Sequence, residues 1–263
     1  MRMAVAWVDP GLAPQHLAPW PDGSDGATLV VGPHAGPEMV AWLDERQIGA
    51  VLLVGRTTSK RPLHYVANVI TGARRNMLVA TRTVPCSALA ALAHASRVVG
   101  LDTDPSSRIA AFDTLAARDW SGAWLKSVVS MSGPNPGFGQ YVRSMFPGGP
   151  RFVAVLGPEP GIHKAAVAIA DAPASGRLLV GPGAEETVVH ALRATFPGLE
   201  LQERPGPPIR DAYGSAGVEF VVDDGAPVPL PGPAAVACRV CRQPLHQSAC
   251  PFCHVVTARS VHE

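Results

Sequence analysis

The sequence lacks long apolar runs, a strong net charge and cysteines outside its C-terminal region. No run approaches the roughly 20 apolar residues of a membrane-spanning helix, and the apolar stretch that follows Met1 is too short for a secretory signal. We therefore expect a cytoplasmic protein that does not enter a membrane. Its 22 basic and 21 acidic residues give a formal charge of +1, so the chain has no overall basic field of the kind that dedicated nucleic-acid binders carry.

Two common catalytic signatures are missing as well. The sequence contains no G-x-S-x-G nucleophile elbow and no H-E-x-x-H zinc-protease motif. At 263 residues and 47% hydrophobic composition, it is still long and apolar enough to bury a sizeable core. We expect a folded protein, and the sequence leaves open whether it is an enzyme.

The C-terminal region carries the clearest motif, two C-x-x-C pairs separated by eight residues. Each pair directs two thiolates at one point, and two pairs complete the closed tetrahedral shell of a structural Zn²⁺. An iron–sulfur site and a pair of disulfides are the alternatives. The fifth cysteine, Cys86, stands alone, and we interpret it as a small buried hydrophobe rather than a nucleophile. We predict a zinc ribbon over residues 238–256 with the metal ligands Cys238, Cys241, Cys250 and Cys253.

Short apolar runs with many β-branched residues alternate with helix-like segments along the first half of the chain. They lie at residues 4–8, 28–31, 50–54, 77–80 and 98–101. This rhythm is typical of an α/β sheet in which most strands are parallel. We therefore predict an α/β fold with one or more mostly parallel, Rossmann-like sheets and a C-terminal zinc ribbon.

Composition divides the chain into five regions. Clusters of glycine and proline interrupt the α/β pattern once near its middle and again before the ribbon. Between these interruptions we expect further strands and two helices, at 163–170 and 185–196. We predict a first α/β domain at 1–131, a Gly/Pro-rich junction at 132–150, a second α/β block at 151–225, a Pro-rich linker at 226–237 and the ribbon at 238–256.

Residues 56–82 contain six basic side chains and no acidic one. Arg56 and Lys60 follow the expected strand 50–54, at the carboxyl edge where open α/β sheets usually bind their ligands. A phosphate group or a nucleic acid would suit such a segment, whereas a simple solvated face is the alternative. The candidate phosphate- or nucleic-acid-binding residues are Arg56, Lys60, Arg61, Arg74 and Arg75.

Asp102 and Asp104 follow the expected strand 98–101 and are the candidate catalytic residues. Two carboxylates at this spacing could hold Mg²⁺ for chemistry on a phosphate group. The alternative is structural, because Asp104 precedes Pro105 and a helical pattern, as helix-capping residues do.

Weak active-site signals beside a clear ribbon favour a subunit or adaptor of a multiprotein assembly, which uses the ribbon to bind a protein partner. The first alternative is a Mg²⁺-dependent enzyme that acts on a phosphate-containing substrate such as a nucleotide or nucleic acid. The second is a nucleic-acid-binding protein that uses residues 56–82 and the ribbon. The sequence does not decide the oligomeric state or whether the two α/β blocks share one sheet.

Overall fold

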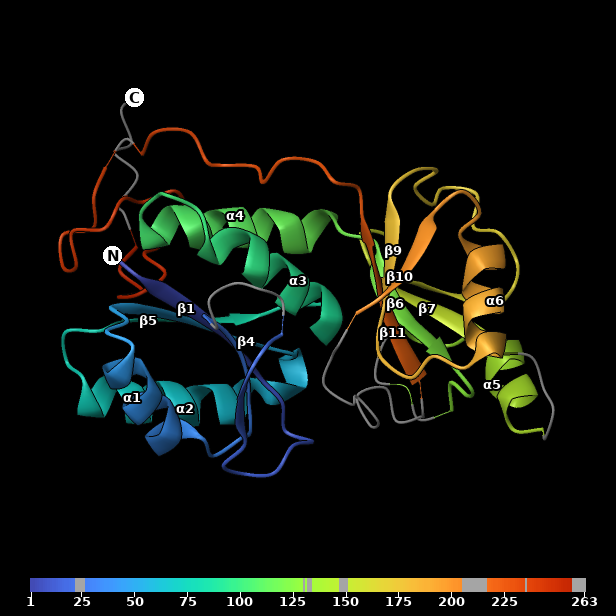
Figure 1. Ribbon diagram of the computed structural model, residues 1–263, viewed down its shortest axis with the longest axis horizontal. Coiled ribbons are helices and arrows are strands. Elements are labelled where there is room, and N and C mark those ends of the chain that lie inside the picture. Colours follow the sequence, from blue (N-terminus) through green and yellow to red (C-terminus); the bar gives the residue numbers. More distant parts are fainter. Residues whose placement is uncertain are drawn as a thin grey trace. The chain divides into compact units, whose positions relative to one another are not determined.

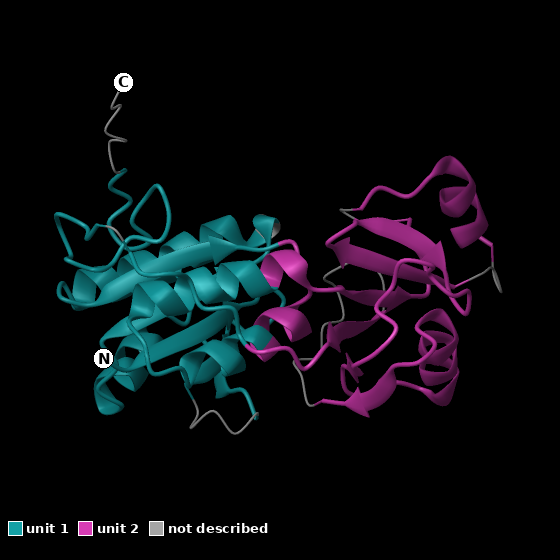
Figure 2. Ribbon diagram, turned by 90° about the horizontal axis from the view of Figure 1, so that it is seen from above, with its two compact units in different colours: residues 1–84, 94–115, 228–263 teal, residues 85–93, 116–227 magenta. Residues whose placement is uncertain are grey.

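The computed structural model describes residues 1–21, 27–129, 131, 134–146, 151–204, 217–234 and 236–256. The chain forms two compact units (Figure 2). Unit 1 comprises Met1–Val84, His94–Leu115 and Val228–Glu263, and unit 2 comprises Pro85–Ala93 and Ala116–Pro227. Each unit has one β-sheet, so the fold is mixed α/β with two sheets. Within the described part of the chain, no helix has the length and apolar character needed to cross a membrane.

The sheet of unit 1 has five strands in the order β2-β3-β1-β4-β5. Their bounds are Leu17–Pro19 for β2, Thr28–Val31 for β3, Met3–Val8 for β1, Ala50–Gly55 for β4 and Leu78–Thr83 for β5. Strand β2 runs antiparallel to β3, whereas the other neighbours pair in parallel. Every residue of β1, β3 and β4 is buried, as in parallel strands that are covered on both faces. The four predicted strands of this region are therefore confirmed.

Helices cover both faces of this sheet (Figure 1). Helices α1 (Gly36–Glu45) and α2 (Lys60–Ala73) lie on one face, where Met39, Leu53 and Ile70 share one apolar core. The other face is covered by residues 94–115, which include parts of α3 (Ala88–Val99) and α4 (Pro105–Arg118). The short helix η1 (Thr57–Ser59) connects β4 to α2.

The sheet of unit 2 has six strands in the order β10-β9-β11-β6-β7-β8. Their bounds are Glu200–Glu203 for β10, Arg177–Val180 for β9, Gly217–Asp223 for β11, Ser121–Leu125 for β6, Phe152–Gly157 for β7 and Gly161–Lys164 for β8. Helix α6 (Glu186–Thr195) adds Val188 and Leu192 to a core that contains Phe196 and Phe220, whose rings are 5.0 Å apart. Helix α5 (Phe138–Ser144) buries none of its residues.

Three predictions for secondary structure are wrong. Only β9 and β10 pair in parallel in unit 2, so its sheet is mostly antiparallel rather than mostly parallel. Residues 98–101 end α3 instead of forming a strand, and the predicted helix at 163–170 begins in strand β8. Short apolar runs fit a strand and a buried helical turn equally well, which explains the second and third errors. The direction of strand pairing in unit 2 depends on contacts between distant segments.

The five predicted region boundaries stay a prediction. Parts of the junction at 132–150 and of the linker at 226–237 lie outside the described residues. The open question about the sheets is answered. Strand β6 belongs to the first predicted block but pairs with β7 and β11 of the second, so the two predicted blocks share the six-stranded sheet.

We predict that Phe196→Ala lowers the free energy of unfolding by about 3–5 kcal/mol, because the substitution leaves a cavity beside Phe220 in the core of unit 2. Urea denaturation followed by circular dichroism measures the change. The matched control is Phe138→Ala in the same unit, since Phe138 is 85% exposed. Equal effects of the two substitutions would show that Phe196 is not part of the core.

Candidate functional site

The carboxyl edge of the sheet in unit 1 collects the residues that follow its parallel strands. Because β3, β1 and β4 run in the same direction, the loops after them meet at this edge. His34 follows β3, and Arg56 follows β4. The ring of His34 lies 5.1 Å from that of Tyr65 on α2, in an edge-to-face arrangement. Polar and aromatic side chains therefore gather where a ligand of such a sheet would bind.

Arg56 is held against the end of β1. Its guanidinium carbon lies 5.9 Å from the centroid of the Trp7 ring, and Trp7 is 2% exposed. A cation at this distance from an aromatic face is attracted by the ring. The contact fixes one positive charge at the carboxyl edge.

Ser59 is a buried hydroxyl at the start of α2. Its Oγ is inaccessible and has no hydrogen-bond partner, although most buried polar atoms in proteins have one. The missing side chain of Gly55 allows this approach, since a Cβ at Gly55 would lie 3.1 Å from the Cβ of Ser59. Ser59 also occupies the N-cap position of α2 without capping it through its side chain. The hydroxyl of Ser59 is therefore a buried donor without a partner at the start of α2.

The first turn of α2 is basic. Lys60 and Arg61 are exposed there, and the turn contains no acidic residue. The partial positive charge at the N-terminus of α2 repels these cations, whereas a bound anion would be attracted by the cations and by the helix dipole. The basic side chains and the helix dipole therefore both favour an anionic ligand at this edge.

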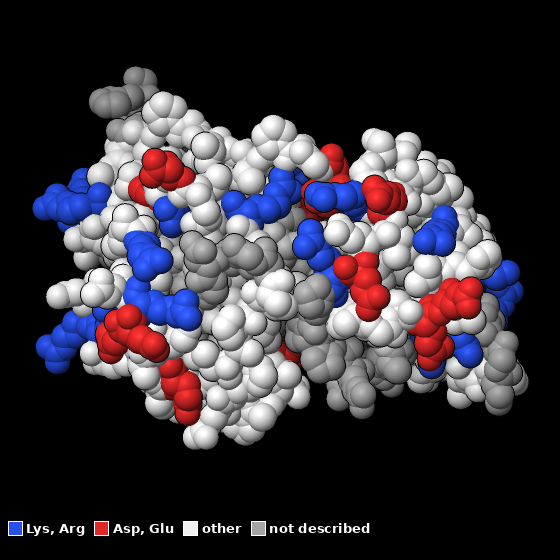
Figure 3. Space-filling view, viewed as in Figure 1, with Lys and Arg blue, Asp and Glu red and all other residues white. Residues whose placement is uncertain are grey.

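The structure divides the predicted basic segment. Arg74 and Arg75 follow the C-terminus of α2, at the opposite edge of the sheet from Arg56. Arg74 donates to the carboxylate of Asp44 at 2.9 Å and to the carbonyl oxygen of Ile48 at 3.2 Å. On the face shown in Figure 3, basic and acidic side chains are interspersed. The segment does not form one continuous basic surface.

Asp102 and Asp104 lie between two helices, α3 and α4, and not after a strand. Asp104 caps α4: its Oδ1 accepts the backbone N–H of Ser107 at 2.9 Å and the hydroxyl of Ser106 at 2.6 Å, and its Oδ2 accepts the hydroxyl of Ser107 at 2.6 Å. Burial alone would raise the pKa of Asp104, but these hydrogen bonds outweigh it and lower the pKa below 3.8. Asp102 is exposed. The predicted Mg²⁺ has no support among the described residues, and the capping alternative explains Asp104.

The four cysteines of the predicted ribbon lie together. Their Sγ atoms are all within 4.8 Å of one another, close to the separation of about 3.8 Å that Zn–S bonds of about 2.3 Å give in a tetrahedron. Each C-x-x-C pair sits in a tight turn closed by an isolated antiparallel bridge. Backbone N–H groups of Cys241 and Val240 lower the pKa of the Cys238 thiol to about 7, and burial raises the pKa of the Cys241 thiol to about 12. The cluster could hold a metal ion such as zinc.

The ribbon is bound to the rest of unit 1. Ser106 Oγ lies 2.7 Å from the carbonyl oxygen of Pro244, so its one proton is shared between this oxygen and Asp104 Oδ1. Ser107 Oγ lies 2.9 Å from Nε2 of His246. Gln247 donates to Asp113 on α4 at 2.6 Å. Both serines also bind Asp104, so one group of hydrogen bonds caps α4 and attaches the ribbon. One face of the ribbon is therefore occupied within the chain.

No family model matches the sequence, and no curated protein matches it. Solved structures do resemble the fold. The fatty acid kinase (Fak) B3 protein of Streptococcus pneumoniae, loaded with linoleic acid, is 12% identical with a TM-score of 0.53, covering 85% of this chain and 100% of that chain. A DegV family protein from Corynebacterium glutamicum is 11% identical with a TM-score of 0.53, covering 87% and 99%. A fatty-acid-binding DegV family protein from Streptococcus agalactiae is 9% identical with a TM-score of 0.53, covering 84% and 98%. At these identities the likeness is one of fold.

These comparisons contradict the function predicted from the sequence. The solved proteins that share the fold are described as DegV family or fatty-acid-binding proteins, and not as zinc-ribbon adaptors, Mg²⁺-dependent enzymes or nucleic-acid binders. The adaptor prediction and both alternatives are therefore wrong. The C-x-x-C motif identified four cysteines that could hold a metal ion, in a module attached to α4, and the basic segment is divided between two edges. The expectation of a protein partner stays a prediction.

We predict that Asp104→Ala lowers the free energy of unfolding by about 1 kcal/mol at pH 7, because α4 loses its cap. The folded chain lowers the pKa of Asp104, so its carboxylate stabilises the fold above the ordinary value of 3.8, and this contribution is lost as the pH falls through the lowered value. Urea denaturation at several pH values should show the difference between variant and wild type shrinking below a pH of about 4. Replacing the exposed Asp102 with alanine is the control and should cost less than about 0.5 kcal/mol. A larger loss for Asp102 than for Asp104 would contradict the capping role.

Proposed function

We propose that this chain binds a long-chain carboxylic acid, and that the sheet of unit 1 acts as Rossmann-like sheets do, with the ligand at its carboxyl edge. The observation that carries the proposal is the fold likeness over 85% of the chain to a protein whose structure holds linoleic acid. Two further proteins with this fold, from Thermus thermophilus and Streptococcus agalactiae, are described as binding fatty acids. The likeness in fold supports a shared class of ligand, and residues at the carboxyl edge could bind its carboxylate.

The carboxylate of the ligand is held by Ser59, Arg56 and the start of α2 in this proposal. A carboxylate accepts hydrogen bonds only, and Ser59 Oγ offers a buried hydroxyl that has no partner within the chain. Lys60 and Arg61 add positive charge in the first turn of α2. Arg56 adds a positive charge whose position Trp7 restricts. Hydrogen bonds from charged or helix-terminal donors to a carboxylate are about twice as strong as neutral ones.

The affinity of delipidated protein for oleate tests this proposal. We expect Ser59→Ala and Arg56→Gln each to weaken oleate binding about tenfold, since a tenfold loss corresponds to about 1.4 kcal/mol and one charged hydrogen bond contributes about 1.5–3 kcal/mol. Isothermal titration calorimetry measures the dissociation constants. We also expect oleyl alcohol, which has the same chain without the carboxylate, to bind more weakly than oleate.

The matched control is Arg75→Gln, because Arg75 is exposed and follows the far end of α2. It should leave the oleate affinity within about twofold. The proposal fails if oleate does not bind the wild-type chain. It also fails if oleyl alcohol binds as tightly as oleate while the Ser59 and Arg56 variants behave like wild type.

We also propose that the four cysteines bind one structural Zn²⁺. Four thiolates form a closed shell, which leaves no coordination position for a substrate. Bound zinc would stabilise a module whose apolar core consists of little more than Leu245, Phe252 and the cysteines themselves. Reduced thiolates match the cytoplasmic location that we propose.

We expect about one zinc ion per chain by elemental analysis of the purified protein, and loss of that zinc in the variant Cys250→Ser. Hydrogen exchange should then increase at residues 236–256 and in the first turn of α4, since the hydrogen bonds of Ser106 and Ser107 to the ribbon depend on its fold. The control Cys86→Ser changes the cysteine outside the motif and should retain the zinc. Equal zinc content in both variants would contradict the assignment.

A further inference from the structure

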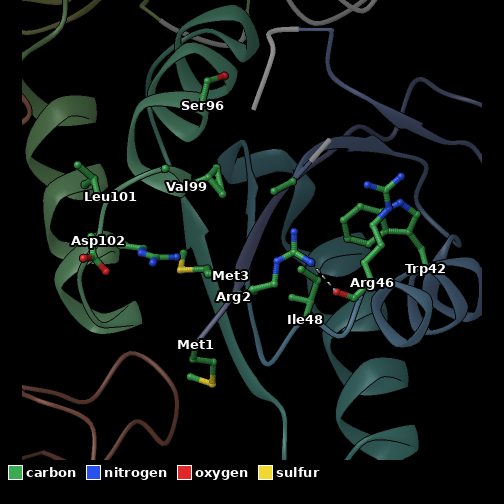
Figure 4. A pocket seen from close by; sticks show the side chains of 13 residues that line it. Met1, Arg2, Met3, Trp42, Arg46, Ile48, Ser96, Val99, Leu101 and Asp102 are labelled. Atoms are coloured by element: carbon green, nitrogen blue, oxygen red, sulfur yellow. Dashed lines mark hydrogen bonds between the residues drawn. The ribbon is translucent and has the colours of Figure 1, made fainter. Parts of the chain in front are cut away.

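A cavity of about 760 Å³ lies at the other edge of the sheet in unit 1, where the strands begin. Its walls come from the start of β1, from the end of α1 and the residues after it, and from α3, α4 and their connection (Figure 4). They include Met3, Trp42, Arg46, Ile48, Ser96, Leu101, Asp102 and Arg108. The volume falls within the range of roughly 300–1,000 Å³ that is usual for small-molecule sites. The proposed fatty-acid site does not use this cavity, because Ser59 and Arg56 lie at the opposite edge.

Arg108 places a buried positive charge in the cavity wall. The residue is 8% exposed, and its Nε is inaccessible without a hydrogen-bond partner. Burial lowers the pKa of its guanidinium, whereas the nearby charges of Asp102 and Asp104 raise it. An arginine stays charged in proteins, and a buried N–H donor without a partner costs free energy. An anion inside the cavity would offset that cost.

Two other arginines line the cavity. Arg2 donates through Nη1 to the carbonyl oxygen of Arg46 at 3.4 Å. The guanidinium carbon of Arg46 lies 5.1 Å from the centroid of the Trp42 ring, and Figure 4 shows the two side chains next to each other. With Arg108 the lining contains three arginines and one acidic residue, Asp102. The balance of charge in the cavity therefore favours an anion.

The remaining lining is largely apolar. Met3, Trp42, Ile48, Val99 and Leu101 contribute to the same walls. A bare inorganic ion would leave this surface in contact with water, whereas a ligand with a short apolar part would cover it. The lining thus selects for an anionic group attached to an apolar body.

We propose that this cavity is a second ligand site, which binds a small organic anion. Its carboxylate or phosphate group pairs with Arg108, and its apolar body lies against Trp42 and Ile48. This site lies at the other edge of the sheet from the proposed fatty-acid site, is formed by different residues and binds a smaller ligand.

Isothermal titration calorimetry with four probes tests the proposal. Phenyl phosphate and phenylacetate combine an anionic group with an apolar ring. Inorganic phosphate has the anionic group without the ring, and benzyl alcohol has the ring without a charge. We expect at least one of the aromatic anions to bind about tenfold more tightly than inorganic phosphate and benzyl alcohol, which corresponds to a difference in binding free energy of about 1.4 kcal/mol. The tighter of the two identifies phosphate or carboxylate as the preferred group.

Two exposed positions give variants with opposite expected effects. Arg46→Gln removes a cation and should weaken binding of the aromatic anion about tenfold. Asp102→Asn removes the one acidic group of the lining and should tighten binding several-fold, a gain that misfolding cannot mimic. Arg75→Gln and Ser59→Ala should leave the affinity unchanged, because neither residue lines the cavity.

Three results would overturn the proposal. The first is that neither aromatic anion binds at millimolar concentration, and the second is that Arg46→Gln and Asp102→Asn both leave the affinity unchanged. The third is that Ser59→Ala abolishes binding, which would place the aromatic anion at the carboxyl edge instead. Oleate binding by Arg46→Gln separates the two sites, because it should equal that of wild type.

Discussion

The parallel pairing of β1 with β4 is the interaction on which the rest of unit 1 depends. Met3 lies opposite Ala50 and Trp7 opposite Val54 in this register, and both strands are buried throughout. Parallel strands require crossover connections, so one edge of the sheet collects the strand ends and the other collects the strand beginnings. The first edge holds the proposed carboxylate site, and the second holds the arginine-lined cavity. A shift of one residue would turn Trp7 to the other face and away from Arg56.

The sequence predicted those parts of the structure that depend on local pattern. The strands of unit 1 were predictable because each is an uninterrupted apolar run, and α6 because its apolar residues recur with helical spacing. Residues 98–101 were not, because Val98 and Val99 are buried in α3 as they would be in a strand. The mostly antiparallel sheet of unit 2 depends on pairings between distant segments, such as β6 with β11. No local pattern records such pairings.

The candidate sites also divide into those that a local sequence pattern predicts and those that depend on contacts between distant segments. The four cysteines were recognisable from spacing alone, and the structure brings them together. Ser59 was missed because its importance comes from the close approach to Gly55 and from the missing side-chain cap of α2. A serine directly before a helical pattern was the available signal, although it usually indicates an ordinary cap. Arg108 was missed as well, because it lines the cavity only where α4 and the start of β1 come together. The ribbon shows that a strong motif can identify a cluster of possible metal ligands without indicating the function of the chain.

The most direct test of the account is a crystal structure of the delipidated chain with oleate. We predict density for the ligand at the carboxyl edge of the sheet in unit 1, with a carboxylate oxygen within hydrogen-bonding distance of Ser59 Oγ and the guanidinium of Arg56 next to it. A carboxylate bound at the arginine-lined cavity, or an apolar chain bound with its carboxylate in solvent and Ser59 still without a partner, would contradict the account.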